Sequence, residues 1–472
     1  MLETQLIFQR QKAKLIKVKN RRQKLKKKYV IAGAGFKGFC DALELINMGD
    51  CEIHIIDKSK KFGGIMYSKV FGNFAVDLGV HVFDSVPQEL ANVVDDIMQG
   101  QIKDIPYDST SAFNNKVTEG FSLPDLSHLS HEQKAQICLE IVELAAREEN
   151  TELATLKDYL VNRYAKTAGN IFCDIFERIY GIAPTDVEPE AIRRTSLGRL
   201  KFLGDDEMKV LKSNDQLDRV LAARRQSMGK IDDLVSVYPT DGNAMKGWCD
   251  RAKVWLENRG VKISLDESIT SIDETSDGIA VTTDKQKVVA DKVIWANDNT
   301  SRLGDLLNVE NSAHKLVHGT SMIFTTFVTK EDQIKDFTYL QNFDVGGVTY
   351  RTAAAGRISS QVDDNGMSFI TCECPTTMGS DDWNDSEGFA AGAWEECKNL
   401  GVIRSGAELV DKDVINIPAT FRSPKIGYEA EIDRLSNEIE EKFPLLVFRD
   451  VKPFFRRELY LDSKGLPDLL NA

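Results

Sequence analysis

Residues 29–38 read YVIAGAGFKG, a short apolar run that ends in a turn with glycines at positions 33, 35 and 38. An apolar run of this length predicts a buried strand. The next residues, 39–48, place apolar side chains at helical spacing, and a glycine ends this helix. A second strand is predicted for 51–57. The stretch therefore predicts a compact strand, turn, helix and strand unit of about thirty residues.

Each glycine of this turn has a physical role. Gly33 permits the sharp turn after the strand, Gly35 lets the backbone approach a pyrophosphate, and Gly38 lets helix and strand pack closely. Phosphates placed there meet free N–H groups at the start of the helix. Asp57 lies nineteen residues beyond Gly38, where a carboxylate can accept ribose hydroxyls. The combination predicts a dinucleotide-binding site; the alternative is a glycine-rich turn without a ligand.

NAD and FAD use the same turn, so the residues beyond it decide between them. The Gly63-Gly64 pair in FGGIMYS (62–68) resembles the second phosphate-proximal turn of FAD enzymes of the glutathione-reductase-like group. The sequence DLGVHVF (77–83) resembles the flavin-edge segment of UDP-galactopyranose mutase and of the related protoporphyrinogen-oxidase and amine-oxidase flavoproteins. The resemblance implies FAD as the cofactor and places His81 near the flavin.

The similarity to this clan continues along the chain, over roughly 29–85, 170–300 and 420–472. It implies an α/β fold, in which a Rossmann-like, glutathione-reductase-like FAD-binding domain carries an inserted α+β substrate domain. The further matching segments are FERIYGIAP (176–184), YPTDG (238–242), GVKI (260–263) with ITSI (269–272), VIWAN (293–297) and YLD (460–462).

The resemblance also implies a division into domains. We expect a basic N-terminal arm at 1–28, a discontinuous FAD-binding domain built from 29–100, 236–305 and 425–472, and a substrate domain built from 101–235 and 306–424.

Periodicity adds expectations about secondary structure. Residues 90–170 are predicted to be helical, with a capping box formed by Ser130 and Gln133. Residues 320–375 alternate as in an antiparallel sheet.

Candidate site residues follow from these segments. In the mutases two arginines grip the substrate diphosphate, and a guanidinium fork suits phosphate geometry. The catalytic candidates are therefore His81, Arg199 and Arg351, with Arg357 as an alternative arginine. Glu373, between two cysteines on a predicted strand, is either a buried acid that faces the pocket or an outward-facing residue. The predicted cofactor-binding residues are Gly33, Gly35, Phe36, Lys37, Gly38, Asp57, Lys58, Gly63, Gly64, Ile65, His81, Ile269, Ala296, Tyr460, Leu461 and Asp462.

The chain also departs from the clan. The closing segment reads VFRDVKP (447–453), without the usual Gly-Arg or Gly-Asp pair. Asp84 stands where the mutases place a second histidine, and their tyrosine-rich diphosphate pocket has no clear counterpart. Substrate and reaction type therefore stay open.

Three functions remain. The first is a mutase-like isomerase that acts on a nucleotide sugar, such as a UDP-sugar, through flavin N5 chemistry. The second is an oxidoreductase of the amine-oxidase or protoporphyrinogen-oxidase type, which passes a hydride from a small molecule to the flavin. The third is a non-catalytic FAD-binding protein.

Composition narrows the cellular setting. The 472 residues carry a net charge of −13, and eight scattered cysteines form no CxxC pair. We therefore expect reduced thiols and a cytoplasmic location. The chain contains no run of 18 apolar residues, so we expect no membrane-spanning helix. Two histidine pairs, His128 with His131 and His314 with His318, have no cysteine or carboxylate nearby at the spacing of metal ligands. We therefore expect no metal site.

The basic arm stands apart from this acidic body. Residues 1–28 hold eleven Lys and Arg against a single acid, Glu3. Such an arm is either solvated or makes weak contact with a protein partner or the inner face of a membrane. We expect a small-molecule substrate and no specific nucleic-acid partner, because nothing in the acidic remainder suggests a nucleic-acid groove.

Overall fold

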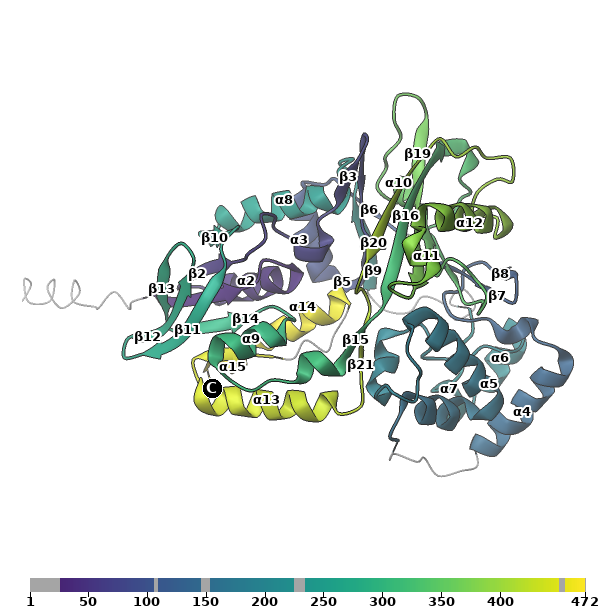
Figure 1. The fold of residues 1–472 in the computed structure, drawn as a ribbon, viewed down its shortest axis with the longest axis horizontal. Coiled ribbons are helices and arrows are strands. Elements are labelled where there is room, and N and C mark those ends of the chain that lie inside the picture. Colours follow the sequence, from purple (N-terminus) through teal and green to yellow (C-terminus); the bar gives the residue numbers. More distant parts are fainter. Residues whose placement is uncertain (1–25, 106–108, 146–152, 225–233, 450–454, 472) are drawn as a thin grey trace, which may run out of the picture.

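The computed structural model describes residues 26–105, 109–145, 153–224, 234–449 and 455–471. All but the last three residues of the predicted basic arm lie outside these ranges. Figure 1 shows a parallel-sheet region at the left, a helical lobe at the lower right and a long antiparallel sheet above that lobe.

The parallel sheet confirms the predicted Rossmann-like core. Its strand order is β10-β2-β1-β14-β22, and every neighbouring pair is parallel. The central strand β1 is apolar over its buried length because a parallel sheet is covered on both faces. The strands are β1 (Lys27–Ala32), β2 (Cys51–Ile56), β10 (Lys262–Ser264), β14 (Lys292–Trp295) and β22 (Leu446–Phe448).

Alternating side chains of β1 face two separate cores. Tyr29 and Ile31 pack on one face of the sheet, among residues of α2, α3, α8 and α14. Val30 and Ala32 pack on the other face, among residues of β11 to β13, α9 and α13. These elements are α2 (Phe36–Met48), α3 (Gln88–Met98), α8 (Ala244–Glu257), α9 (Thr300–Leu307), α13 (Tyr428–Lys442), α14 (Arg456–Lys464), β11 (Ile269–Thr275), β12 (Gly278–Thr283) and β13 (Lys287–Ala290).

A second sheet has the strand order β20-β16-β19-β18-β17-β7-β8. The long strands β16 and β19 pair antiparallel over their whole length, which confirms the antiparallel sheet predicted for 320–375. The strands are β7 (Ser109–Phe113), β8 (Lys116–Thr118), β16 (Ser321–Lys330), β17 (Tyr339–Asn342), β18 (Arg351–Ala353), β19 (Met367–Thr376) and β20 (Asp411–Ile417).

The helical prediction for 90–170 is wrong over residues 102–118. Residues 102–118 contribute β6 (Ile102–Asp104), β7 and β8. These short strands depend on partners far away in the chain, such as β17 beside β7, so local periodicity does not reveal them. The capping box of Ser130 and Gln133 is confirmed by two reciprocal hydrogen bonds of 3.2 Å.

The helical lobe has a core of its own, which includes Tyr164, Phe172 and Phe176. Its helices are α4 (His131–Ala145), α5 (Leu156–Tyr180), α6 (Asp205–Lys212) and α7 (Asp215–Asp218).

A three-stranded sheet, β5-β9-β6, links strands on either side of the boundary expected at residue 100. Its further strands are β5 (Phe83–Pro87) and β9 (Leu234–Pro239). The domain boundaries therefore remain a proposal. Within the described ranges, no helix has the length and apolar character needed to cross a membrane.

Candidate functional site

The glycine turn after β1 lies at the carboxyl end of the parallel strands. Gly33 has φ +130°, and a Cβ there would lie 2.7 Å from the Ala296 carbonyl oxygen. A Cβ on Gly38 would lie well under 3.0 Å from the Gly33 carbonyl oxygen. A Cβ on Gly35 would meet no atom within 4 Å. The outer glycines are thus required by packing, whereas Gly35 faces free space at the start of α2.

The second glycine pair lies against this turn. Gly63 N–H donates to the Ala34 carbonyl oxygen at 2.8 Å, and Gly35 and Gly63 pair as an isolated parallel bridge. Both Gly63 and Gly64 have positive φ, and a Cβ on Gly63 would overlap Cys249 Sγ. Two glycine segments, 33–38 and 63–64, therefore form one side-chain-free surface, which we call the glycine platform.

Helix α2 begins on the glycine platform without a competing charge. Its first turn holds no acidic residue, and its N-cap, Gly35, supplies no capping side chain. Phe36 and Lys37 occupy the first two helical positions, so their N–H groups belong to the helix start, where backbone donors and the helix dipole favour phosphate. The platform has the geometry of a dinucleotide-phosphate site.

Asp57 follows β2 at the edge of the platform. One carboxylate oxygen accepts from Ala34 N–H at 2.7 Å, and the other accepts from Ser59 N–H at 2.6 Å. These contacts fix the carboxylate and leave each oxygen with further acceptor capacity. Lys58 and Ile65 are exposed, Ile65 by 82%. At both positions the side chain is exposed, so a contact with a ligand would be made by that exposed side chain.

Ile269 and Ala296 have backbone roles near the platform. Ile269 opens β11, and its carbonyl oxygen accepts from Arg302 Nη2 at 2.8 Å. Ala296 follows β14 and donates its N–H to Ala32 at 3.0 Å. Ala296 thereby places the carbonyl oxygen that forces position 33 to be glycine.

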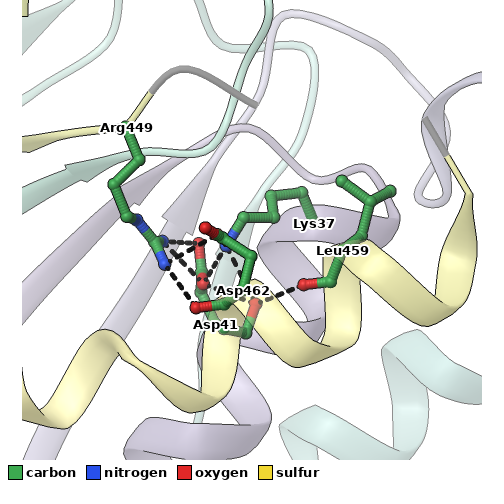
Figure 2. A network of polar contacts seen from close by, with 6 residues as sticks. Lys37, Asp41, Arg449, Leu459 and Asp462 are labelled. Atoms are coloured by element: carbon green, nitrogen blue, oxygen red, sulfur yellow. Dashed lines mark hydrogen bonds and ion pairs between the residues drawn. The ribbon is translucent and has the colours of Figure 1, made fainter. Parts of the chain in front are cut away.

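Lys37 does not direct its ammonium to the platform. It forms ion pairs with Asp41 (2.6 Å) and Asp462 (2.8 Å), as Figure 2 shows. Arg449 binds both oxygens of Asp41 at 2.8 Å and Asp462 at 3.0 Å. Ser463 adds a hydrogen bond of 2.8 Å to Asp41. These five residues, the α2–α14 ion network, join helix α2 to helix α14.

The network engages side chains of several residues in the expected cofactor set. Asp41 is fully buried and Lys37 nearly so, because their charges are paired. Asp462 uses its carboxylate within the network, Tyr460 is buried in the core, and Leu461 is 47% exposed. Because the Lys37 ammonium is paired within the network, Lys37 would contact a phosphate there through its backbone N–H. The sequence analysis did not identify Asp41 or Arg449, although the Lys37–Asp41 i, i+4 spacing was a visible signal.

The His81 segment runs between the two sheets. It borders a small hollow of about 10 Å³. Within the lining, Asp77 accepts hydrogen bonds from Ser68 Oγ (2.6 Å) and Tyr238 OH (2.5 Å). Burial raises the pKa of the Asp77 carboxyl. The rest of the wall is largely apolar and includes Ala75, Val80, Val82, Ala353, Ala355, Ile358 and Phe369.

His81 is held as a neutral imidazole. Burial, reinforced by the nearby charges of Arg456 and Arg351, holds the pKa of His81 well below its usual value. Its Nδ1 atom is buried and has no hydrogen-bond partner among the described residues. At neutral pH this histidine offers a hydrogen-bonding ring and is a poor proton donor.

Arg351 is brought to His81 through Glu373. Arg351 Nη2 and Glu373 Oε2 lie 2.5 Å apart on neighbouring strands β18 and β19. A Cβ on Gly79 would lie 3.6 Å from both Glu373 Oε1 and His81 Nε2. The structure therefore gathers three predicted site residues on the two sides of Gly79. Glu373 is buried, in agreement with the first of its two interpretations.

Aromatic side chains lie near Arg351, which was not apparent from the sequence. The guanidinium lies 5.5 Å from the ring centre of Tyr350 and 5.1 Å from that of Phe421. The Phe421 ring in turn lies 5.7 Å from that of Tyr180. Tyr180 belongs to α5 and Tyr350 precedes β18, so a large sequence separation concealed their proximity.

The other candidate arginines lie elsewhere. Arg199 belongs to the helical lobe, where Nη1 donates to the backbone carbonyls of Asp218 (2.6 Å) and Leu221 (3.0 Å). Arg357 pairs with Glu331 at 2.7 Å. The structure does not bring either guanidinium into the cluster around His81.

Comparisons with known proteins agree with this geometry. Residues 31–97 match the model of the NAD(P)-binding Rossmann-like domain. No curated protein matches the chain in sequence.

Three solved structures are similar over most of the chain. A reduced UDP-galactopyranose mutase is 15% identical, with a TM-score of 0.73 over 95% of this chain and 94% of that chain. A putrescine oxidase bound to putrescine is 14% identical, with a TM-score of 0.61 over 94% and 99%. An oxidoreductase from Methanosarcina mazei is 15% identical, with a TM-score of 0.55 over 83% and 88%. The chain therefore shares the fold of these enzymes, with a Rossmann-like domain at residues 31–97.

Proposed function

We propose that this chain is an FAD-dependent enzyme that acts on a nucleotide sugar. The observation that carries the FAD assignment is the glycine platform, where two glycine segments meet and Gly35 faces free space at the start of α2. A single glycine turn serves any dinucleotide. The second segment beside it agrees with the FAD resemblance of residues 62–83.

The residues present fit FAD. Backbone N–H groups at Gly35 to Gly38, with the adjoining Gly63 and Gly64, would hold the pyrophosphate. Asp57 would accept the ribose hydroxyls. Nδ1 of His81 is a buried atom without a hydrogen-bond partner among the residues that the structure describes. Bound FAD would supply a flavin N5 position for bond-making or hydride transfer.

The nucleotide-sugar assignment rests on Arg351 and on the whole-chain similarity to UDP-galactopyranose mutase. A guanidinium between aromatic rings suits a phosphate next to a planar base. Glu373 holds this guanidinium in place, and the neutral His81 orients groups beside it. In this proposal the chain's residues bind and orient the substrate.

The apolar hollow beside His81 favours a second candidate. Its apolar side chains, such as Ala353 and Ala355, would exclude water from the space beside His81. Such a wall suits hydride transfer from a small molecule, as in an oxidoreductase of the amine-oxidase or protoporphyrinogen-oxidase type. We also propose a cytoplasmic location, with any membrane or protein contact made through the basic arm at 1–28.

The test begins with the visible spectrum of the purified protein and an FAD titration. The FAD-loaded protein is then titrated with UDP and UDP-sugars, while flavin fluorescence and melting temperature are followed. A mutase should bind UDP and turn over only after the flavin is reduced. If UDP changes neither signal, the nucleotide-sugar proposal is refuted. Anaerobic bleaching of the flavin by an amine would support the oxidoreductase instead.

A further inference from the structure

The loop that joins β17 to β18, residues 343–350, is held by an arginine of the helical lobe. Arg178 lies near the end of α5, and its Nη1 donates to the Asn342 carbonyl oxygen at 2.8 Å. Its Nη2 donates to the carbonyl oxygens of Gly347 and Thr349, both at 2.6 Å. The planar fork of a guanidinium presents several donors at fixed angles, which allows one side chain to bind both ends of the loop.

A carboxylate holds the same loop through its N–H groups. Glu396 belongs to α12 (Ser386–Asn399). One carboxylate oxygen accepts from Val348 N–H at 2.8 Å, and the other accepts from the N–H and the Oγ1 of Thr349, both at 2.6 Å. Thr349 is fully buried, where an unpaired peptide group would be costly. Arg178, Glu396 and the loop 343–350 together are called the β17–β18 clamp.

The end of α5 is fixed independently of this loop. The Tyr180 carbonyl oxygen accepts from His318 Nε2 at 2.9 Å and from Thr320 Oγ1 at 3.0 Å. Arg178 lies two residues before Tyr180, in the last turn of the helix. The helix end therefore serves as an anchor, and Arg178 ties the loop to it.

The loop leads directly into the candidate site. Tyr350 N–H donates to the Glu373 carbonyl oxygen at 2.8 Å, and Arg351 follows as the first residue of β18. The centre of the Phe421 ring lies 6.0 Å from that of Tyr350 and 5.7 Å from that of Tyr180. The clamp thus joins the two elements, α5 and β18, that bring these side chains together.

We propose that Arg178 is a positioning residue of the candidate site and that Glu396 assists it. The β17–β18 clamp sets where Tyr350 and Arg351 lie relative to Tyr180, so that these side chains have their binding arrangement before a substrate arrives. Such preorganisation raises affinity by lowering the cost of ordering the site. This inference rests on the proposed function, because it concerns the residues that would bind the substrate.

The first measurement is hydrogen exchange of the FAD-loaded full chain, read by mass spectrometry of its peptides. Arg178→Gln removes three hydrogen bonds from a charged donor, each of which contributes more than about a factor of ten to an equilibrium. Exchange across 343–350 should therefore become at least about tenfold faster. The end of α5 should keep its wild-type rate, because His318 and Thr320 still hold Tyr180. Glu396→Gln should show the same confined pattern.

The matched control is Arg251→Gln. Arg251 also donates from Nη1 to a backbone carbonyl oxygen, that of Met98 at 3.1 Å, but it belongs to α8. This variant should leave exchange across 343–350 unchanged. If Arg178→Gln leaves the loop at its wild-type rate, or speeds exchange equally throughout the chain, the proposal is refuted. Should Arg178→Gln fail to fold, Arg178→Lys replaces it: the charge stays, the fork is lost, and a several-fold acceleration confined to the loop is expected.

The second measurement separates positioning from stability. Calorimetry compares UDP binding to FAD-loaded Arg178→Gln, Arg351→Gln and the double variant. Arg178→Gln alone should weaken binding by about tenfold, and it should add much less in the Arg351→Gln background, because Arg178 acts through the placement of Arg351. Losses that simply multiply would refute the positioning role.

Failure of the proposed function gives a different pattern. If the wild type does not bind UDP, the nucleotide-sugar proposal is refuted, and the exchange rates alone decide the clamp: confined acceleration supports it, and an unchanged loop refutes it. If the wild type and Arg178→Gln bind UDP equally well, the nucleotide-sugar proposal stands and the positioning role is refuted.

Discussion

Substitution of single glycines in the turn separates cofactor binding from folding. Gly35 has φ −80° and ψ −174°, an ordinary extended conformation, and an added methyl group would meet no atom within 4 Å. Gly35→Ala should therefore change the free energy of unfolding by no more than about 0.5 kcal/mol. The methyl group would stand where the pyrophosphate approaches the backbone. Loss of one or two charge-assisted hydrogen bonds, about 1.5–3 kcal/mol each, should weaken FAD binding by at least about tenfold.

Gly38→Ala should have the opposite effect. Its methyl group would overlap the Gly33 carbonyl oxygen, which is backbone and cannot rotate away. Helix α2 would have to shift from β1, and overpacking of this kind costs about 1–3 kcal/mol. Urea unfolding of the FAD-free protein and a fluorescence titration with FAD measure the two effects separately. If Gly35→Ala binds FAD as tightly as the wild type, the glycine platform is not the phosphate site.

Three further predictions concern charges. Asp41→Asn leaves the two buried cations of the α2–α14 ion network undercompensated, so urea unfolding should show a free energy of unfolding lower by about 3–5 kcal/mol. The control, Glu257→Gln, removes one acid of an exposed ion pair and should lower the free energy of unfolding by less than about 1 kcal/mol; equal losses in the two variants would contradict the reasoning. Burial lowers the pKa of His54 to about 4, so the unfolded chain binds the extra proton below pH 6.5, and stability should fall by about 2 kcal/mol between pH 7 and pH 5. In urea unfolding at both pH values, His54→Gln should remove this difference, and an unaltered pH dependence would exclude His54 as its source. Arg199→Gln should lower the free energy of unfolding by about 1–3 kcal/mol, because two hydrogen bonds to backbone carbonyls are lost, and should leave UDP affinity unchanged in calorimetry. Weaker UDP binding at unchanged stability would instead show that Arg199 contacts the substrate.

The part of the fold that the sequence predicted has local causes. The β1–α2–β2 unit combines a buried-strand run, glycines at fixed spacing and a helix with an apolar face, all within about thirty residues. The capping box at Ser130 is equally local. By contrast, β22 has only three residues and takes its place by pairing with β14, more than a hundred positions earlier. Periodicity could not identify such a strand.

The site was predictable in proportion to how local its parts are. His81 and Arg351 were identified, one from a motif and the other from its predicted strand. Lys37 shows the limit of such local patterns: its place in the glycine turn suggested a cofactor contact, and its side chain pairs with Asp41 and with Asp462, which lies far along the chain.

The distribution of charge along α2 and α14 connects these observations. Near the glycine platform the two cations, Lys37 and Arg449, face two acids, Asp41 and Asp462, so their charges cancel within the protein. Dinucleotide affinity must then come from backbone N–H groups and the helix dipole, whose donors need no counter-ion.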